Sequence, residues 1–298
     1  MTNMRPSLNE LGLSAGKKAR LHRILHEHGL GNGTALFLPY DQGLEHGPRD
    51  FFANPAASDP RYIIKLALEG GFNGIAIQIG LAEKFYWDYA GEVPLILKLN
   101  GKTDIPPDAQ ALSPLHASVA DAVRLGADAV GYTLYVGTPA QEADFAQFRQ
   151  VHQEATRLGM PLVVWSYPRG SAIEARGGKD SFYAVDYAAR VASELGADLV
   201  KVNFPHPERR ADVKKEYDQE FSAQQAIDAV VRSANRTLLL VSGGERVGDE
   251  AMLEKARQSM EAGATGLIFG RNVWQRPHDE SLHFVEALRG ILEKYPSR

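Results

Sequence analysis

Eight short apolar segments recur along the chain, and each is followed by a longer stretch with a different spacing. The apolar segments span residues 35–43, 72–80, 94–101, 127–137, 161–170, 197–204, 237–245 and 265–273. Between them, stretches such as 113–126 and 186–196 carry apolar residues at helical spacing and end on glycine, a common helix stop. The pattern predicts an α/β protein in which helices join short strands.

A weak internal repeat precedes several of these strands. The sequences RLGADAV (124–130), ELGADLV (194–200) and EAGATGL (261–267) each place a glycine at a helix end, then a short loop and a strand, and LEGGFNGI (68–75) is a looser copy. Glycine suits the left-handed position after a helix, and the two or three residues that follow it are a common loop length before a strand. The repeat therefore indicates one helix–strand unit that recurs along the chain.

The number of units favours a closed barrel. Strands that are continuously apolar and joined by helices predict a parallel sheet covered on its faces. Eight units within residues 35–298 fit a (β/α)8 TIM barrel better than an open doubly wound sheet, which is the alternative. We expect residues 1–34 to form a short N-terminal helical extension, in which Ser14 caps a basic, solvated helix that runs to His28 and covers the lower end of the barrel.

Composition and charge exclude several classes of site and partner. The chain has 298 residues, a formal net charge of -4 and no cysteine. Disulfides, thiolate metal sites and cysteine nucleophiles are therefore excluded, and the acidic balance argues against a nucleic-acid partner. No apolar run approaches the length of a membrane helix, and the first residues lack the apolar core of a signal peptide. We expect a cytoplasmic protein with no membrane partner.

Polar residues gather at the carboxyl ends of the predicted strands, where barrels of this kind carry their chemistry. By strand alternation, Trp165, Tyr167 and Arg169 share one face of the fifth strand, and Lys201 and Asn203 share one face of the sixth. Other residues at strand ends are Asp41, Gln42, Glu45, His46, Lys98, Asn100, Ser242, Gly243, Gly244, Gly270 and Arg271. This concentration at one end of so many strands is typical of an enzyme.

Lys201 stands in the middle of an apolar strand, where a buried ammonium is costly to desolvate. Its head could reach the barrel mouth or pair with Asp41, or it could act as a Schiff-base amine. A lysine with an ordinary pKa of about 10.4 is almost fully protonated at neutral pH and is not nucleophilic. Burial and a second cation such as Lys98 would both lower that pKa, so two strand lysines in one barrel mouth favour covalent amine chemistry.

The residues expected near this lysine each have a structural and a functional interpretation. Tyr167 could be a hydrogen-bonded aromatic at the rim, or it could transfer protons beside an iminium whose charge would lower its pKa. Asp41 could be a turn acid or a lysine partner, and His46 could serve only to hold a loop. Trp165 could be a packing residue and Asn203 a loop anchor. The residue types alone leave these alternatives open.

Glycine-rich turns follow the seventh and eighth strands. SGGE (242–245) and GRN (270–272) fall where barrels often bind phosphate on backbone amides and at the N-terminus of an extra helix. Glycine lets the backbone approach an anion, and Arg271 offers a forked donor. Tight turns that merely use glycine are the alternative interpretation.

Metal chemistry has little support in the sequence. His22 and His26 are four residues apart on the predicted N-terminal helix, but this helix lies outside the barrel. No other tight cluster of histidine and carboxylate residues is evident. We therefore expect neither a metal nor another cofactor.

Six stretches together resemble the archaeal-type class I fructose-bisphosphate aldolase family, which also has bacterial members. They are YDQGLEHGP, LILKLNGKT, WSYPRG, DLVKVNF, VSGGE and FGRN. The resemblance runs from about Ala35 to the last helix and implies a metal-independent, homo-oligomeric enzyme. Its expected partners are phosphorylated ketose and aldehyde substrates. Archaeal members usually have histidine where this chain has Gln42, and bacterial members resemble it there.

The resemblance also implies a role for each residue at the strand ends. Lys201 would form an iminium with the substrate ketone, Tyr167 would be the acid/base, and Asp41 would lie at the reacting hydroxyls and amine. Trp165 would shape the pocket, and Arg169 would lie near one of two phosphates. The residues expected to hold the other phosphate are Ser242, Gly243, Gly270 and Arg271. The remaining substrate-binding residues that we expect are His46, Lys98 and Gly244.

The reaction implied is the cleavage of fructose 1,6-bisphosphate to dihydroxyacetone phosphate and glyceraldehyde 3-phosphate. Carbon–carbon cleavage leaves a carbanion, which an iminium on Lys201 would delocalise as an enamine. The family also includes transaldolase-type synthases and a thiolase that act on related phosphorylated compounds, and the motifs do not separate them. A non-catalytic barrel that senses sugar phosphates would need the phosphate-binding residues, but not Lys201 and Tyr167 in working geometry.

Overall fold

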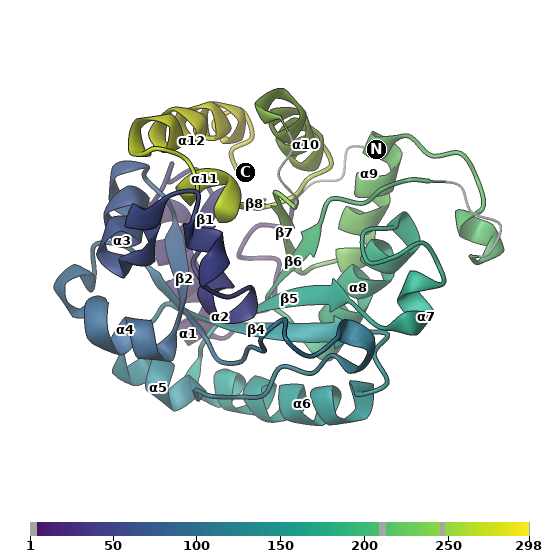
Figure 1. The fold of residues 1–298 in the computed structure, drawn as a ribbon, viewed down its shortest axis with the longest axis horizontal. Coiled ribbons are helices and arrows are strands. Elements are labelled where there is room, and N and C mark those ends of the chain that lie inside the picture. The colour runs from purple at the N-terminus through teal and green to yellow at the C-terminus, as the bar shows by residue number, and fades with distance from the viewer. Residues whose placement is uncertain (1–4, 209–212, 245–247, 298) are drawn as a thin grey trace.

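Eight parallel strands close into a barrel, and helices surround it (Figure 1). The computed structural model describes residues 5–208, 213–244 and 248–297. The strands pair in chain order, and β1 pairs with β8 to close the ring. The strands are β1 (Ala35–Pro39), β2 (Gly74–Gln78), β3 (Leu95–Lys98), β4 (Ala129–Val136), β5 (Leu162–Pro168), β6 (Leu199–Asn203), β7 (Leu238–Ser242) and β8 (Gly266–Ile268). The predicted (β/α)8 barrel is confirmed, and the open sheet is not formed.

Each predicted strand is present, with shorter bounds than the apolar pattern indicates. The largest difference is at the eighth strand, where β8 ends at Ile268 and residues 271–273 belong to a short helix instead. Glu245, the last residue of the predicted seventh strand, lies outside the described residues. The turn after β8 thus replaces the end of a predicted strand.

Most of the helices alternate with the strands and pack on the outside of the barrel. They are α1 (Ala15–His22), α2 (Gln42–Glu45), α3 (Pro60–Glu69), α4 (Ile79–Phe85), α5 (Val119–Arg124), α6 (Gln141–Leu158), α7 (Ser171–Glu174), α8 (Phe182–Leu195), α9 (Ala223–Ala234), α10 (Asp249–Glu261), α11 (Arg271–Trp274) and α12 (His278–Leu292). A π-helical turn, η1 (Arg23–Glu27), and several 3-10 turns accompany them: η2 (Pro48–Phe51), η3 (Pro55–Ser58), η4 (Trp87–Tyr89), η5 (Asp108–Gln110) and η6 (Lys215–Tyr217). Among the helices of the described ranges, none is long and apolar enough to cross a bilayer.

The glycines of the internal repeat adopt the predicted conformation. Gly126, Gly196 and Gly263 have φ values of 69°, 99° and 95°, and Gly71 in the looser copy has 60°. A residue with a Cβ is strained in this left-handed region, whereas glycine is not. Each of these glycines therefore lets the chain leave a helix and enter the next strand through a short loop.

The N-terminal helix closes the lower end of the barrel. Leu21, Ile24 and Leu25 are buried and pack with the inward-facing residues of the strands, such as Phe37. The helix is less solvated than its basic sequence predicts, because Lys17 Nζ lies 2.7 Å from Asp198 Oδ2 in a buried ion pair. The barrel interior is thus covered from below.

Two details of this helix differ from the sequence-based expectation. Ser14 precedes α1 as its N-cap residue, but its side chain makes no capping hydrogen bond. The final turn, Arg23–Glu27, is π-helical and ends before His28. Ile24 and Leu25 in this turn are buried against the barrel.

The two ends of the described chain meet beside the ring closure. The Arg5 guanidinium donates hydrogen bonds to the backbone oxygens of Thr265, at 3.2 Å, and Tyr295, at 2.7 Å. The Ser297 amide donates to the backbone oxygen of Asn32 at 2.7 Å. Segments from both ends of the sequence therefore hold the same side of the barrel.

Candidate active site

A cavity of about 300 Å³ opens at the carboxyl ends of the strands. The predicted site residues that line it are Asp41, His46, Trp165, Tyr167, Arg169, Lys201, Ser242, Gly243, Gly244, Gly270 and Arg271. Lys98 lies beneath this cavity and is absent from its lining. Residues without an assigned role in the sequence analysis also line it, among them Glu45, Lys102, Asp108 and Tyr135. The barrel thus brings together nearly the whole predicted site.

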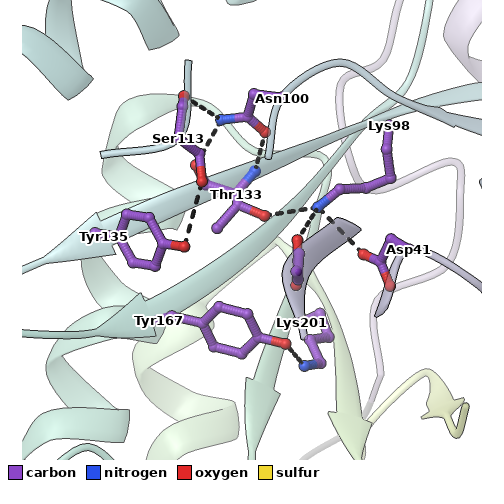
Figure 2. A network of polar contacts seen from close by, with 9 residues as sticks. Asp41, Lys98, Asn100, Ser113, Thr133, Tyr135, Tyr167 and Lys201 are labelled. Atoms are coloured by element: carbon purple, nitrogen blue, oxygen red, sulfur yellow. Dashed lines mark hydrogen bonds and ion pairs between the residues drawn. The ribbon is translucent and has the colours of Figure 1, made fainter. Parts of the chain in front are cut away.

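Lys201 on β6 reaches the cavity beside Tyr167 on β5. The strand register places Trp165 next to Lys201, so Tyr167 lies two residues further along the same face. The Lys201 amine donates a hydrogen bond to the Tyr167 hydroxyl and lies 4.1 Å from the centroid of its ring (Figure 2). The predicted pairing of these two side chains across neighbouring strands is therefore present.

Burial changes the protonation of Lys201. Desolvation lowers the pKa of its amine to about 7, although the charges of Asp41 and Glu45 oppose this change. The nearby cations Lys98 and Arg169 lower the pKa further. A substantial fraction of Lys201 is therefore a neutral, nucleophilic amine near pH 7.

Tyr167 is held as a neutral phenol in the free protein. Burial raises its pKa well above the usual value, and the negative charges of Glu45 and Asp41 raise it further. Arg169, which lies 5.1 Å from the ring centroid, acts in the opposite direction. The lowering of this pKa expected beside an iminium does not apply to the free protein, because here burial and, after it, the two carboxylates raise the pKa.

Lys98 on β3 forms the floor beneath these groups. Its side chain is 0% exposed and donates a hydrogen bond of 2.6 Å to Thr133 Oγ1. The ammonium lies 3.4 Å from Asp41 Oδ2 and 3.6 Å from Glu45 Oε1, and 4.3 Å from the centroid of the Trp165 ring. Figure 2 shows Lys98 directed towards Asp41, whereas Lys201 is directed towards Tyr167. Asp41 is therefore the partner of Lys98, and Lys98 does not reach the cavity.

A glycine on β4 makes room for this floor. A Cβ at Gly131 would lie 2.8 Å from Lys98 Cδ and 2.8 Å from Trp165 Cζ3. Contacts this close require one of the neighbours to move, and both are enclosed in the barrel. Gly131 thus allows the lysine stem and the indole to pack side by side.

Glu45 is a buried carboxylate whose role the sequence did not reveal. Desolvation raises its pKa, and the charge of Asp41 raises it further, while Lys98 lowers it. Glu45 ends the short helix α2, four residues after Asp41, so both carboxylates face the same ammonium. This spacing of four was the available sequence signal, but only the fold shows the lysine that the two acids share.

The turns after β7 and β8 form the other side of the cavity. Gly244 has a left-handed φ of 64°, and a Cβ at Gly270 would lie 2.9 Å from the backbone oxygen of Pro39. Ser242 Oγ donates a 2.7 Å hydrogen bond to Asn203 Oδ1, which supports the interpretation of Asn203 as an anchor. Glycine at these positions is therefore required by backbone geometry and close packing, and the same turns leave the backbone accessible from the cavity.

Two arginines line the cavity on different elements, and each lies near a carboxylate. Arg271 Nε lies 3.7 Å from Asp50 Oδ2, and His46 Nδ1 lies 2.8 Å from the same oxygen. His46 therefore holds the loop that carries Asp50, as its structural interpretation predicts. Arg169 Nε lies 2.9 Å from Asp108 Oδ2. Arg169 is therefore held by a direct ion pair, whereas Arg271 has only a longer contact with its carboxylate, and both arginines line the cavity.

The chain is similar to known aldolases over most of its length. The family model described as DeoC/LacD family aldolase matches residues 35–276. The class 1 fructose-bisphosphate aldolase of Thermoproteus tenax is 41% identical over 261 residues, covering 87% of this chain and 90% of that protein. The class 1 fructose-bisphosphate aldolase of Halobacterium salinarum is 37% identical over 264 residues, covering 88% and 91%.

Solved structures show the same relationship. An archaeal fructose-1,6-bisphosphate aldolase, with its catalytic lysine covalently bound to the carbinolamine intermediate, superimposes with a TM-score of 0.78 at 38% identity. That comparison covers 91% of this chain and 98% of the other. A fructose-bisphosphate aldolase from Slackia heliotrinireducens gives a TM-score of 0.83 at 27% identity, covering 98% and 93%.

Proposed function

The chain belongs to the DeoC/LacD family of aldolases, and from this premise we propose that it is a class I fructose-bisphosphate aldolase. It would reversibly cleave fructose 1,6-bisphosphate to dihydroxyacetone phosphate and glyceraldehyde 3-phosphate through a Schiff base. The observation that carries the proposal is the Lys201 amine, whose pKa is lowered to about 7 and which lies against the Tyr167 hydroxyl in the cavity.

The first half of the reaction forms the covalent intermediate. The neutral Lys201 amine attacks the ketone carbon, and the resulting carbinolamine accepts a proton on its hydroxyl and loses water to give the iminium. The new positive charge develops near Asp41 and Glu45, which in the free protein share the single charge of Lys98. The negative charges of these two carboxylates favour a cation at Lys201, against the effects of burial and Lys98, and they therefore stabilise the iminium.

The second half breaks the carbon–carbon bond. A base removes the proton from the hydroxyl on the second carbon from the iminium carbon. The bond between this second carbon and the carbon adjacent to the iminium carbon then breaks, and its electrons form the enamine. Glyceraldehyde 3-phosphate leaves, the enamine is protonated on carbon, and hydrolysis then returns the free amine and dihydroxyacetone phosphate. We assign the proton transfers to Tyr167, whose hydroxyl lies at the amine, and an orienting role to Asp41.

The cavity wall offers two places for the two phosphates. Arg271 with Ser242, Gly243, Gly244 and Gly270 would hold one phosphate through a forked guanidinium and backbone amides. Arg169 would receive the other. Trp165, packed beside the Lys98 ammonium, would shape the pocket between them.

The chain organisation and assembly that we propose follow from the same family. The family match begins at residue 35, which supports a division into an extension (1–34) and a barrel domain (35–298). We also propose a cytoplasmic homo-oligomer that acts in glycolysis and gluconeogenesis. Light scattering during gel filtration would give the subunit number, and a monomer at working concentration would contradict this part.

A coupled assay tests the proposed reaction. Cleavage of fructose 1,6-bisphosphate is measured by the reduction of dihydroxyacetone phosphate with an auxiliary dehydrogenase, for the wild type and for Lys201→Ala. We expect turnover by the wild type and none above background by the variant. Transfer of a three-carbon unit to another acceptor with no simple cleavage would indicate a synthase, and phosphate-sugar binding without any turnover would indicate a sensor.

A further inference from the structure

Asp108 connects two cations at the rim of the cavity. Its Oδ1 lies 2.7 Å from Lys102 Nζ, and its Oδ2 lies 2.9 Å from Arg169 Nε. Asp108 begins the 3-10 turn η5, which lies in the loop of residues 99–118 between β3 and α5. All three side chains line the cavity. One loop carboxylate thus places an oxygen on each of two cations from different elements.

The two cations are more enclosed than the carboxylate between them. The side chains of Lys102 and Arg169 are 14% and 18% exposed, whereas that of Asp108 is 52% exposed. Partial burial would raise the pKa of the Asp108 carboxyl, but the hydrogen bond from Lys102 and the charge of Arg169 outweigh it and lower that pKa. Asp108 is therefore an ionised, surface-accessible anion on a fixed cationic pair.

The other carboxylate beside a cavity arginine is built differently. Asp50, next to Arg271, has a side chain that is only 9% exposed and accepts the contact from His46 at 2.8 Å. Its distance to Arg271 Nε is 3.7 Å, longer than a direct hydrogen bond. Asp50 is thus an enclosed part of the wall, whereas Asp108 is a half-exposed carboxylate on a loop.

A phosphate group can replace this carboxylate on the same two cations. It is a dianion with three terminal oxygens, and both an ammonium and a guanidinium donate to such oxygens. We propose that Lys102 and Arg169 together bind the second phosphate of the substrate, and that Asp108 occupies this place in the free protein until the phosphate displaces it. The proposal rests on the proposed function for the identity of the substrate, and it assigns Lys102 and Asp108 as specificity-determining residues.

The arrangement has a measurable consequence for selectivity. A partly exposed ion pair stabilises a protein only slightly, so Asp108 competes weakly and reduces affinity for a bisphosphate by about two- to fivefold. A ligand with one phosphate, bound at the glycine turns and Arg271, does not need to displace Asp108. Selectivity for the bisphosphate thus depends on Lys102 and Arg169 and is moderated by Asp108.

Equilibrium binding of unreactive ligands tests this directly. Hexitol 1,6-bisphosphate and hexitol 1-phosphate have no carbonyl that Lys201 could attack, so calorimetry measures their phosphate contacts without catalysis. We expect Asp108→Asn to tighten binding of the bisphosphate about two- to fivefold and to leave the monophosphate within a factor of about two. Lys102→Ala should weaken the bisphosphate about fivefold or more, again with little effect on the monophosphate.

Asp104→Asn is the matched control, because it removes the same charge from the same loop. Asp104 pairs with Arg49 instead of Arg169, so the variant should change the ratio of the two affinities by less than twofold. Three outcomes would overturn the proposal. They are weaker binding of the bisphosphate by Asp108→Asn, an equal change in its affinity for both ligands, or the same change in the ratio of affinities for Asp108→Asn and Asp104→Asn. Wild-type cleavage of fructose 1,6-bisphosphate is measured separately, so failure of the aldolase assignment would be recognised apart from failure of this site.

Discussion

The Lys98 ammonium lies 3.4 Å from Asp41 Oδ2 with no exposed surface, whereas the Lys201 amine lies in the cavity at the Tyr167 hydroxyl. The same barrel therefore holds two lysines with different tasks. Lys98 has a carboxylate partner and a hydroxyl partner inside the barrel. Lys201 is desolvated, which favours its neutral form.

This difference predicts which lysine becomes covalently modified. Borohydride added with dihydroxyacetone phosphate should reduce an iminium and add mass to the peptide that contains Lys201. Peptide mass spectrometry locates the adduct, and protein without ligand is the control. An adduct on the peptide that contains Lys98 would contradict the assignment.

Metal removal should not affect turnover. The iminium accepts the electrons of the broken bond, so the proposed mechanism requires no divalent ion. Activity is compared after dialysis against excess chelator and after subsequent addition of divalent ions. Loss of turnover that returns with a metal ion would show that a different mechanism operates.

The pH profile should report the lowered pKa of Lys201. Because only the neutral amine attacks the ketone, kcat/KM should fall about tenfold per pH unit below about 7 and level off above it. Competitive acylation of Lys201 at several pH values, followed by mass spectrometry, measures the same titration without catalysis. A titration near the ordinary lysine value would mean that desolvation does not control this amine.

Replacing Tyr167 with phenylalanine should separate chemistry from binding. The variant loses one oxygen and keeps the ring, so Lys201 and Arg169 retain their packing contacts. Acid–base groups typically contribute about 10²–10⁴-fold, and we expect a kcat loss in this range with a much smaller change in KM. Borohydride should still trap an iminium in the variant. Near-normal turnover would mean that Asp41 or a water molecule, rather than Tyr167, transfers the protons.

Arg271→Ala should weaken phosphorylated substrates selectively. A hydrogen bond from a guanidinium to phosphate contributes about 1.5–3 kcal/mol, so KM for fructose 1,6-bisphosphate should rise about tenfold or more. Unphosphorylated fructose at high concentration is the comparison substrate. An equal loss for both sugars would point to damage of the cavity as a whole.

Gly131→Ala should reduce stability by overpacking the floor. The added methyl would lie 2.8 Å from Lys98 and Trp165, and such insertions cost about 1–3 kcal/mol in the free energy of unfolding. At Gly290 in α12, a Cβ would meet no atom of the described residues within 4 Å, so Gly290→Ala should be neutral or stabilising by up to about 1 kcal/mol. Urea unfolding of both variants measures the difference, and similar values for the two would contradict the packing argument.

The sequence predicted the barrel and the strand of each catalytic candidate because both depend on regular spacing. Apolar periodicity located β5 and β6, and alternation then placed Tyr167 and Lys201 on inward faces. Regular spacing does not show how deeply an inward-facing side chain lies within the barrel. Lys98 and Lys201 both fit an inward strand position, but the fold buries the first completely and gives Asp41 to it rather than to Lys201.

The apolar periodicity of the sequence also could not predict contacts made by irregular segments. Asp108 lies in a loop without periodicity, so its approach to Lys102 and Arg169 required the three-dimensional structure. The sequence around Gly131 does not indicate that glycine is needed there, because many small or apolar residues would fit a strand. The need for glycine comes from two side chains on neighbouring strands. Such features follow from the packing of several elements rather than from any one stretch of sequence.

The pairing of β1 with β8 has a consequence for the folding of the protein during its synthesis on the ribosome. Synthesis proceeds from the N-terminus, so β1 emerges more than two hundred residues before its partner Gly266–Ile268 is made. Until then β1 has a free edge, and the carbonyl groups of Thr265 and Tyr295 that receive Arg5 do not yet exist. The N-terminal segment is therefore among the last parts to reach its final place, although it is the first to be synthesised.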